Sequence, residues 1–125
     1  MKKQTRQPHP AEVQALQQLF QSGLLPQAEA RAKTMLAMYP NVLFLYNILG
    51  LSQQAQGKLR EAVTSFRKML SIDPHIAELH FNLGVILSQI SETKEAIASY
   101  RKALQLKPNF TVAHFNLGTL LQTQS

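Results

Sequence analysis

One stretch of the chain reads Ala77-Glu78-Leu79-His80-Phe81-Asn82-Leu83-Gly84, and its last three residues recur 34 positions later as Asn116-Leu117-Gly118. The same interval separates the prolines Pro40, Pro74 and Pro108. Further columns in this register hold glycine, alanine or leucine: Gly50, Gly84 and Gly118; Ala28, Ala62 and Ala96; Leu49, Leu83 and Leu117; Leu36, Leu70 and Leu104; and Gly23 with Gly57. So many matching columns indicate an internal repeat.

The apolar residues within one repeat predict two helices. The first helix carries one apolar stripe, formed by Leu79, Leu83, Ile86 and Ile90. Their spacing of three or four residues brings them to one face of a helix. Residues 91–93 are polar and interrupt the pattern, and a second apolar stripe follows over residues 96–104. Each repeat is therefore a helix hairpin, which buries both stripes only when copies stack into a solenoid.

The 34-residue period and the placement of glycine, alanine, aromatic residues and proline resemble the tetratricopeptide repeat family. The clearest copy spans residues 77–110, and the preceding copy carries Tyr46, Leu49-Gly50, Gly57, Glu61-Ala62, Phe66 and Pro74. In the first copy, Leu16 stands where the packing glycine belongs and Ala32 where an aromatic residue is expected. The resemblance implies an all-α fold, a right-handed αα-superhelix of helix hairpins with about seven helices. Its expected parts are a basic, disordered tail (1–8), a degenerate repeat (9–42), two repeats (43–76 and 77–110) and a half repeat or capping helix (111–125).

Composition narrows the class of protein. The hydrophobic fraction of 45% and the charged fraction of 16% are typical of a folded globular chain. No apolar run approaches the roughly 18 residues of a membrane-spanning helix. No apolar signal segment follows Met1-Lys2-Lys3, and the chain has no cysteine. We expect a cytoplasmic protein without membrane insertion.

The residues that usually carry catalysis do not form a recognisable motif. Catalysis requires polar groups with complementary roles that converge, and the sequence shows no phosphate-binding loop or nucleophile motif. Glu61 and Glu95 share one repeat column, which predicts a structural role. His80 and His114 share a column with Tyr46, and tyrosine is a poor substitute for an imidazole ligand of a metal. We therefore predict a protein that is not an enzyme and has no cofactor or metal.

The formal net charge of +6 raises the question of an acidic partner. The pairs Arg67-Lys68 and Arg101-Lys102 fall at equivalent positions of second helices, and other basic residues lie in turns or in the tail. Basic residues that bind nucleic acid are instead gathered along a groove with stacking aromatics. The pattern favours a solvated face, and no specific nucleic-acid partner is expected.

The first helix of each hairpin has a second stripe, which is not needed for the core. It alternates apolar residues with amides, a composition that suits an extended peptide: amides bond to its backbone and apolar groups receive its side chains. The predicted peptide-binding residues are Asn47, Leu51 and Gln54 in the second copy, Glu78, Phe81, Asn82, Val85 and Gln89 in the third, and Val112, Phe115, Asn116 and Thr119 in the last. Phe81 and Phe115 are expected to be exposed aromatic contacts.

Asn82 and Asn116 fall in the column of the asparagines that line the peptide groove of tetratricopeptide domains. The pattern resembles most the superhelix of O-linked N-acetylglucosamine transferase-like proteins, which implies a ladder that grips peptide backbone. In family members that bind chaperone tails, this asparagine acts with basic residues on a C-terminal carboxylate. The basic partners are missing here, because the residues one turn after the asparagines are Val85 and Thr119. A chaperone-tail ligand is therefore not expected. The alternative is that both asparagines serve only local helix packing.

Two functions remain open at this point. The first is a non-catalytic protein–protein interaction scaffold that binds an extended peptide or protein segment in its concave groove. The second is the substrate-targeting arm of a larger enzyme, a glycosyltransferase, sulfotransferase or methyltransferase, truncated at Ser125. The apolar pattern of the last helix also predicts a homodimer through its exposed face.

Overall fold

The computed structural model describes residues 7–124, and this part of the chain forms seven helices. They are α1 (Pro10–Gln21), α2 (Leu25–Met38), α3 (Leu43–Ala55), α4 (Leu59–Ile72), α5 (Ala77–Gln89), α6 (Thr93–Leu106) and α7 (Thr111–Gln124). The chain divides into two compact units, and the boundary falls within α4, between Ser65 and Phe66. Most of the predicted basic tail, residues 1–6, lies outside the described residues.

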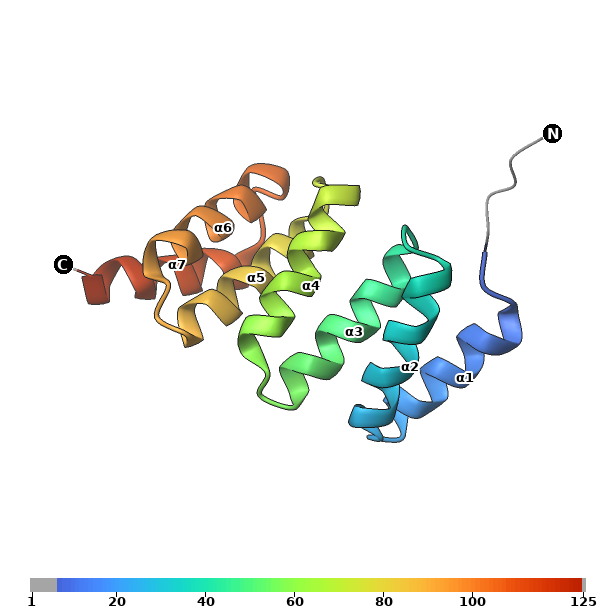
Figure 1. Ribbon diagram of the computed structural model, residues 1–125. Helices are drawn as coiled ribbons and strands as arrows, with labels where there is room; N and C mark the ends of the chain where they lie inside the picture. Colours follow the sequence, from blue (N-terminus) through green and yellow to red (C-terminus); the bar gives the residue numbers. More distant parts are fainter. Residues whose placement is uncertain (1–6, 125) are drawn as a thin grey trace. The chain divides into compact units, whose positions relative to one another are not determined.

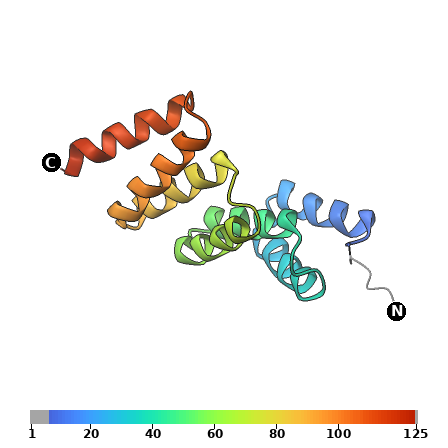
Figure 2. The ribbon, with the colours of Figure 1, turned by 90° about the horizontal axis from the view of Figure 1, so that it is seen from above.

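Short turns join successive antiparallel helices in each unit, as Figures 1 and 2 show for α1 to α3 and for α5 to α7. In the second unit, the stripe on α5 is buried at Leu79, Leu83 and Ile86. The facing stripe on α6 is buried at Ala96, Tyr100 and Ala103. The hairpin with two apolar stripes, predicted from the spacing of these residues, is confirmed.

Gly84 lets α5 and α6 approach closely. A β-carbon at this position would lie 2.8 Å from Cε1 of Tyr100 and 2.9 Å from its Cδ1, whereas carbon atoms in contact usually stand about 3.5–4.0 Å apart. The ring of Tyr100 thus occupies the space that any side chain at position 84 would need. Gly118, one repeat later, has no atom within 4 Å of the corresponding point.

The turns inside the hairpins repeat one backbone conformation. Gly23 and Gly57 have φ angles of 77° and 78°, and Ser91, the third member of this column, has a φ of 65°. In each turn the next residue donates its N–H to a carbonyl five positions back, as Lys58 does to Gln53 at 2.8 Å. This pattern closes the C-terminus of the preceding helix and needs one residue in the left-handed region, which favours glycine. Ser91 adopts it at a conformational cost of roughly 1–2 kcal/mol.

A hydrogen bond recurs where one hairpin passes to the next. The Tyr46 hydroxyl donates to the carbonyl oxygen of Pro40 at 3.0 Å. In the same two columns, Nε2 of His80 bonds to the carbonyl of Pro74 at 2.9 Å, and Nε2 of His114 bonds to that of Pro108 at 2.8 Å. All three side chains of this column thus tie the first helix of a hairpin to the proline before it, which is a structural role.

A buried carboxylate joins α2 to the turn after α3 in the first unit. Glu29 is only 5% exposed. It accepts hydrogen bonds from Lys58 and Gln56, both at 2.9 Å, and from Gln53 at 3.5 Å, and it pairs with Lys33 at 3.2 Å. Burial alone raises the pKa of Glu29, but the bonds from these four side chains outweigh it and lower the pKa from 4.5 to about 2.

The two glycines of one column provide a matched pair for a stability test. We expect Gly84→Ala to lower the free energy of unfolding by about 1–3 kcal/mol, because the added methyl group collides with the Tyr100 ring. Gly118→Ala meets no neighbour and gains helix propensity, so it should raise this free energy by up to about 1 kcal/mol. Urea unfolding of both variants gives the comparison. Equal effects of the two substitutions would contradict the close approach at Gly84.

The carboxylate of Glu29 should make the stability pH-dependent. The pKa is lowered in the folded chain, so the contribution is complete above pH 4.5 and is lost as the pH falls toward 2. We expect Glu29→Gln to cost about 2–3 kcal/mol at pH 7, and the difference from the wild type to shrink at pH 3. Glu61→Gln, at an exposed position on α4, is the control. A cost of Glu29→Gln that is the same at both pH values would refute this account.

Candidate peptide-binding site

A hollow of about 380 Å³ lies between α5 and α7 in the second unit. Five of its lining residues belong to the stripe predicted to bind peptide, and four do not. The predicted ones are Val85, Gln89, Phe115, Asn116 and Thr119, and the others are Ser88, Tyr100, Leu120 and Thr123. The structure thus brings one part of the predicted stripe together around a single concave surface.

Tyr100 reaches this hollow from α6. Its ring is 2% exposed, and the side-chain amide of Asn116 donates a hydrogen bond to its hydroxyl oxygen at 3.4 Å. Burial raises the pKa of Tyr100, and the bond from Asn116 opposes this only in part. The phenol therefore stays protonated at neutral pH and can act as a hydrogen-bond donor.

Asn82 lies in the same column as Asn116 but has different surroundings. It is half-buried, and within residues 7–124 its side-chain amide has no hydrogen-bond partner. The reason is the residue that stands one repeat before Tyr100: Phe66 has no hydroxyl group to accept a bond. Asn82 therefore keeps both donors and its acceptor for a ligand, whereas Asn116 shares one donor with Tyr100.

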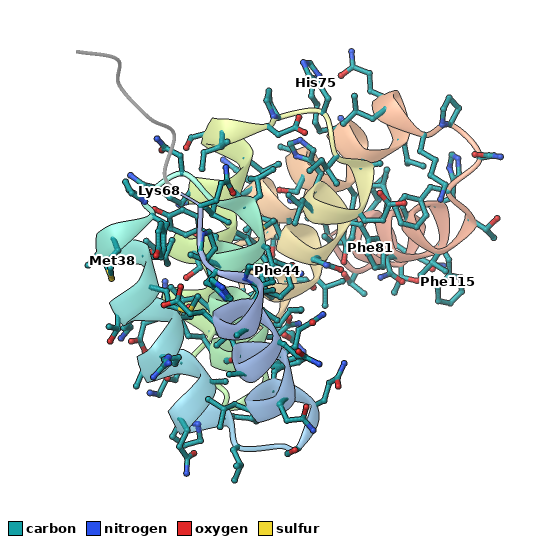
Figure 3. The ribbon with its side chains drawn as sticks, turned by 90° about the vertical axis from the view of Figure 1, so that its right-hand side faces the viewer. Met38, Phe44, Lys68, His75, Phe81 and Phe115 are labelled. Carbon is teal, nitrogen blue, oxygen red and sulfur yellow. The ribbon has the colours of Figure 1, made fainter. Side chains whose placement is uncertain are left out.

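The two phenylalanines expected to be exposed differ. Phe81 is half-buried, and its ring lies 5.0 Å from that of Phe110 and 5.8 Å from that of Tyr100, measured between centroids. The expectation was therefore wrong for Phe81, because two aromatic neighbours cover it. Phe115 is 72% exposed and points away from the ribbon (Figure 3).

Glu78 has a basic neighbour that the sequence analysis did not foresee. Lys107 lies 3.4 Å from its carboxylate and also stands 4.6 Å above the centre of the Phe110 ring. A backbone hydrogen bond and, after it, the bond from Lys107 lower the pKa of Glu78. Because both partners are exposed, this pair contributes little to stability. It nevertheless occupies the carboxylate that was predicted to face a peptide.

The remaining predicted residues lie on α3 and α7. Asn47, Leu51 and Gln54 are half-buried on α3 in the first unit. Val112, in the first turn of α7, is 52% exposed. None of these four lines the hollow between α5 and α7. Their part in binding stays a prediction, as does a homodimer through α7.

Two segments of the sequence match models of a known family. Residues 77–110 match a model of the tetratricopeptide repeat, and residues 45–76 match another model of the same repeat. The matches together run from 45 to 110, which is more than half of the chain. The chain belongs to the tetratricopeptide repeat (TPR) family.

Solved structures share the fold of this TPR protein. The type III secretion chaperone SycD of Yersinia enterocolitica, in complex with a peptide of the translocator YopD, matches with a TM-score of 0.86 and 19% identity, over 92% of this chain and 93% of SycD. MamA matches with a TM-score of 0.85 and 19% identity over 90% of this chain, which spans 66% of the MamA chain. The first TPR domain of Spaghetti (RPAP3), bound to the HSP90 peptide SRMEEVD, matches with a TM-score of 0.83 and 16% identity, over 91% and 90% of the two chains. The predicted all-α, TPR-type fold is confirmed, and no curated protein matches the sequence.

The part of the TPR chain that the structure describes has neither a cluster of metal ligands nor a membrane-spanning helix. No group of three or more histidine, aspartate or glutamate side chains there is placed to hold a metal ion. None of its helices has the length and apolar character needed to cross a membrane.

Tyr100 is the residue at this site that the sequence analysis missed. It lies within the apolar stripe predicted over residues 96–104, yet its hydroxyl reaches Asn116. The sequence did contain a sign of this role: the repeat column that holds Phe66 in one copy holds Tyr100, with its hydroxyl group, in the next. A buried tyrosine hydroxyl usually finds a hydrogen-bond partner, so this replacement predicts a polar neighbour.

The contrast between Phe81 and Phe115 can be tested by unfolding. We expect Phe81→Ala to lower the free energy of unfolding by about 2 kcal/mol, since it removes a ring packed on two others. Phe115→Ala should change it by less than about 0.5 kcal/mol, because the ring is mostly in water. Thermal unfolding of both variants measures the difference. Comparable losses would show that Phe115 is packed as tightly as Phe81.

Proposed function

We propose that this TPR protein is a non-catalytic interaction scaffold, and that it binds an extended segment of a partner protein along the exposed side chains of α5 and α7. The observation that carries the proposal is the hollow lined by Val85, Gln89, Phe115, Asn116 and Thr119. The lining combines apolar groups with the side-chain amides of Gln89 and Asn116, and together they match the side chains and backbone of a peptide.

The state of the amides supports a ligand role over local packing alone. Asn82 makes no hydrogen bond to any described side chain or backbone group, although it is half-buried. An asparagine that serves only to join helices would bond to a neighbouring helix, and Asn82 forms no such bond within the described residues. Its amide is reached by solvent and is therefore available to a peptide backbone.

Proteins with the same fold supply a second line of support. SycD is in complex with a peptide of YopD, and the RPAP3 domain is bound to an HSP90 peptide. Both chains align with this one over more than nine-tenths of its length. A peptide or protein segment is therefore the class of ligand that best fits the hollow.

The test begins with capture from a lysate of the source organism on the immobilised 125-residue chain. A captured protein is then divided into overlapping synthetic peptides, and their affinities are measured by fluorescence anisotropy. We expect one linear peptide to bind, and the double variant Asn82→Ala, Phe115→Ala to weaken it at least tenfold, or about 1.4 kcal/mol.

The matched control is the double variant Gln27→Ala, Gln105→Ala, which removes two exposed amides from α2 and α6. It should leave the affinity within twofold of the wild type. Circular dichroism confirms that both double variants are folded. Equal weakening by the two, or a partner of which no linear peptide binds, would refute the proposed groove.

A further inference from the structure

The hollow between α5 and α7 has no charged wall. Its nine lining residues include no lysine, arginine, histidine, aspartate or glutamate, although the chain has 13 basic and 7 acidic residues. Another hollow in the same unit, of about 310 Å³, is lined in part by Arg67, Glu95 and Lys102. The absence of charge is therefore a property of this particular surface.

This lining selects against charged ligand groups. A charge that leaves water without a partner carries a large desolvation cost. Val85 and Leu120 offer such a charge no compensation, and no lining residue carries an opposite charge that could pair with it. An aliphatic or aromatic side chain gains free energy in the same place, by about 25 cal/mol for each Å² of apolar surface it removes from water.

The polar groups at the floor are arranged for a neutral amide. Asn116 donates one N–H to the oxygen of Tyr100, and no described residue accepts the Tyr100 hydrogen or donates to the Asn116 oxygen. This pair therefore retains one unused donor, the phenol hydrogen, and one unused acceptor, the amide oxygen. A peptide group fits this pair, because it presents one C=O and one N–H.

The size of the hollow limits what enters. Sites for small ligands have volumes of roughly 300–1,000 Å³, and about 380 Å³ lies at the lower end of this range. The exposed ring of Phe115 stands at its margin and adds an apolar surface for the entering group. One side chain with its adjoining peptide groups matches these dimensions.

We propose that this hollow is a subsite for one uncharged aliphatic or aromatic side chain of the bound segment, and that Tyr100 and Asn116 hold the adjoining peptide group. The inference rests on the proposed function, since it names the chemistry of the ligand at the same surface. The subsite admits a leucine-like residue and excludes lysine-like and aspartate-like residues.

Blocked single amino acids test this without a natural partner. The ¹⁵N-labelled 125-residue chain is titrated with N-acetyl-leucine-N′-methylamide, and with the lysine and aspartate derivatives, while amide shifts are followed by NMR. We expect the leucine probe to give saturable shifts at Val85, Asn116 and Thr119, and the charged probes to bind at least tenfold more weakly. Because the lining has no charge, raising NaCl from about 50 to about 500 mM should change the leucine affinity by less than twofold.

Two variants locate the binding. Thr119→Lys introduces a charge into the lining and should abolish the shifts, whereas Thr34→Lys, at an exposed threonine on α2, should not. Tyr100→Phe should weaken the leucine probe severalfold without unfolding the chain, since phenylalanine already stands in this column at Phe66.

Charged probes that bind as well as the leucine probe would overturn the subsite, and so would the absence of saturable shifts at tens of millimolar. The capture experiment can fail independently of this titration. If the double variant Asn82→Ala, Phe115→Ala binds the captured partner as tightly as the wild type does, the proposed function is refuted, even where the leucine probe binds. A groove-dependent partner combined with a silent titration refutes only the subsite.

Discussion

The contact between the Tyr100 ring and the bare α-carbon of Gly84 is the constraint on which the second unit depends. It sets how closely α5 and α6 approach, because a β-carbon at position 84 would stand 2.8 Å from the ring. The same side chain continues toward α7, where its hydroxyl oxygen accepts a bond from Asn116. Tyr100 therefore connects three helices and also forms part of the hollow's wall. A wall fixed by core packing is preorganised, which reduces the entropy that a ligand loses on binding.

This arrangement explains why two asparagines of one column are not equivalent. Asn116 is oriented by the Tyr100 hydroxyl, whereas Asn82 lies one repeat earlier, where Phe66 replaces the tyrosine. An amide held in one orientation can bond to a peptide group that runs in one direction only. An amide that is free to rotate can bond to a peptide group in either direction. The repeat thus places an asparagine at both positions, and the residue in the column of Phe66 and Tyr100 determines whether that asparagine has a hydrogen-bond partner within the protein.

In the first unit, a buried polar network joins two helices. Its first repeat has Glu29 in the column that holds Val63 and Ile97, and the second repeat has Gln53 in the column that holds Leu87. The two polar replacements lie together, with Gln53 also accepting a bond from Ser65 at 2.6 Å. Charge-assisted hydrogen bonds are stronger than neutral ones, and these join α2 to α3 and to the turn that follows it. The two polar replacements therefore satisfy each other in the interior, where an unpaired polar group would be costly.

The sequence by itself determined the helix hairpins and the packing role of the glycine column that holds Gly84, because each of these depends on residues within one repeat and on spacing along the chain. It also predicted Val85, Asn116 and Thr119 on one surface, since Val85 and Thr119 hold the same place in successive repeats and Asn116 shares a helix stripe with Thr119. Only the tertiary structure decided that Phe81 is covered and Phe115 exposed, that Lys107 pairs with Glu78, and that the Tyr100 hydroxyl meets Asn116. These outcomes depend on which side chain of a neighbouring helix reaches a given position. Contacts between helices fix such relations, and the periodicity of a single helix does not contain them.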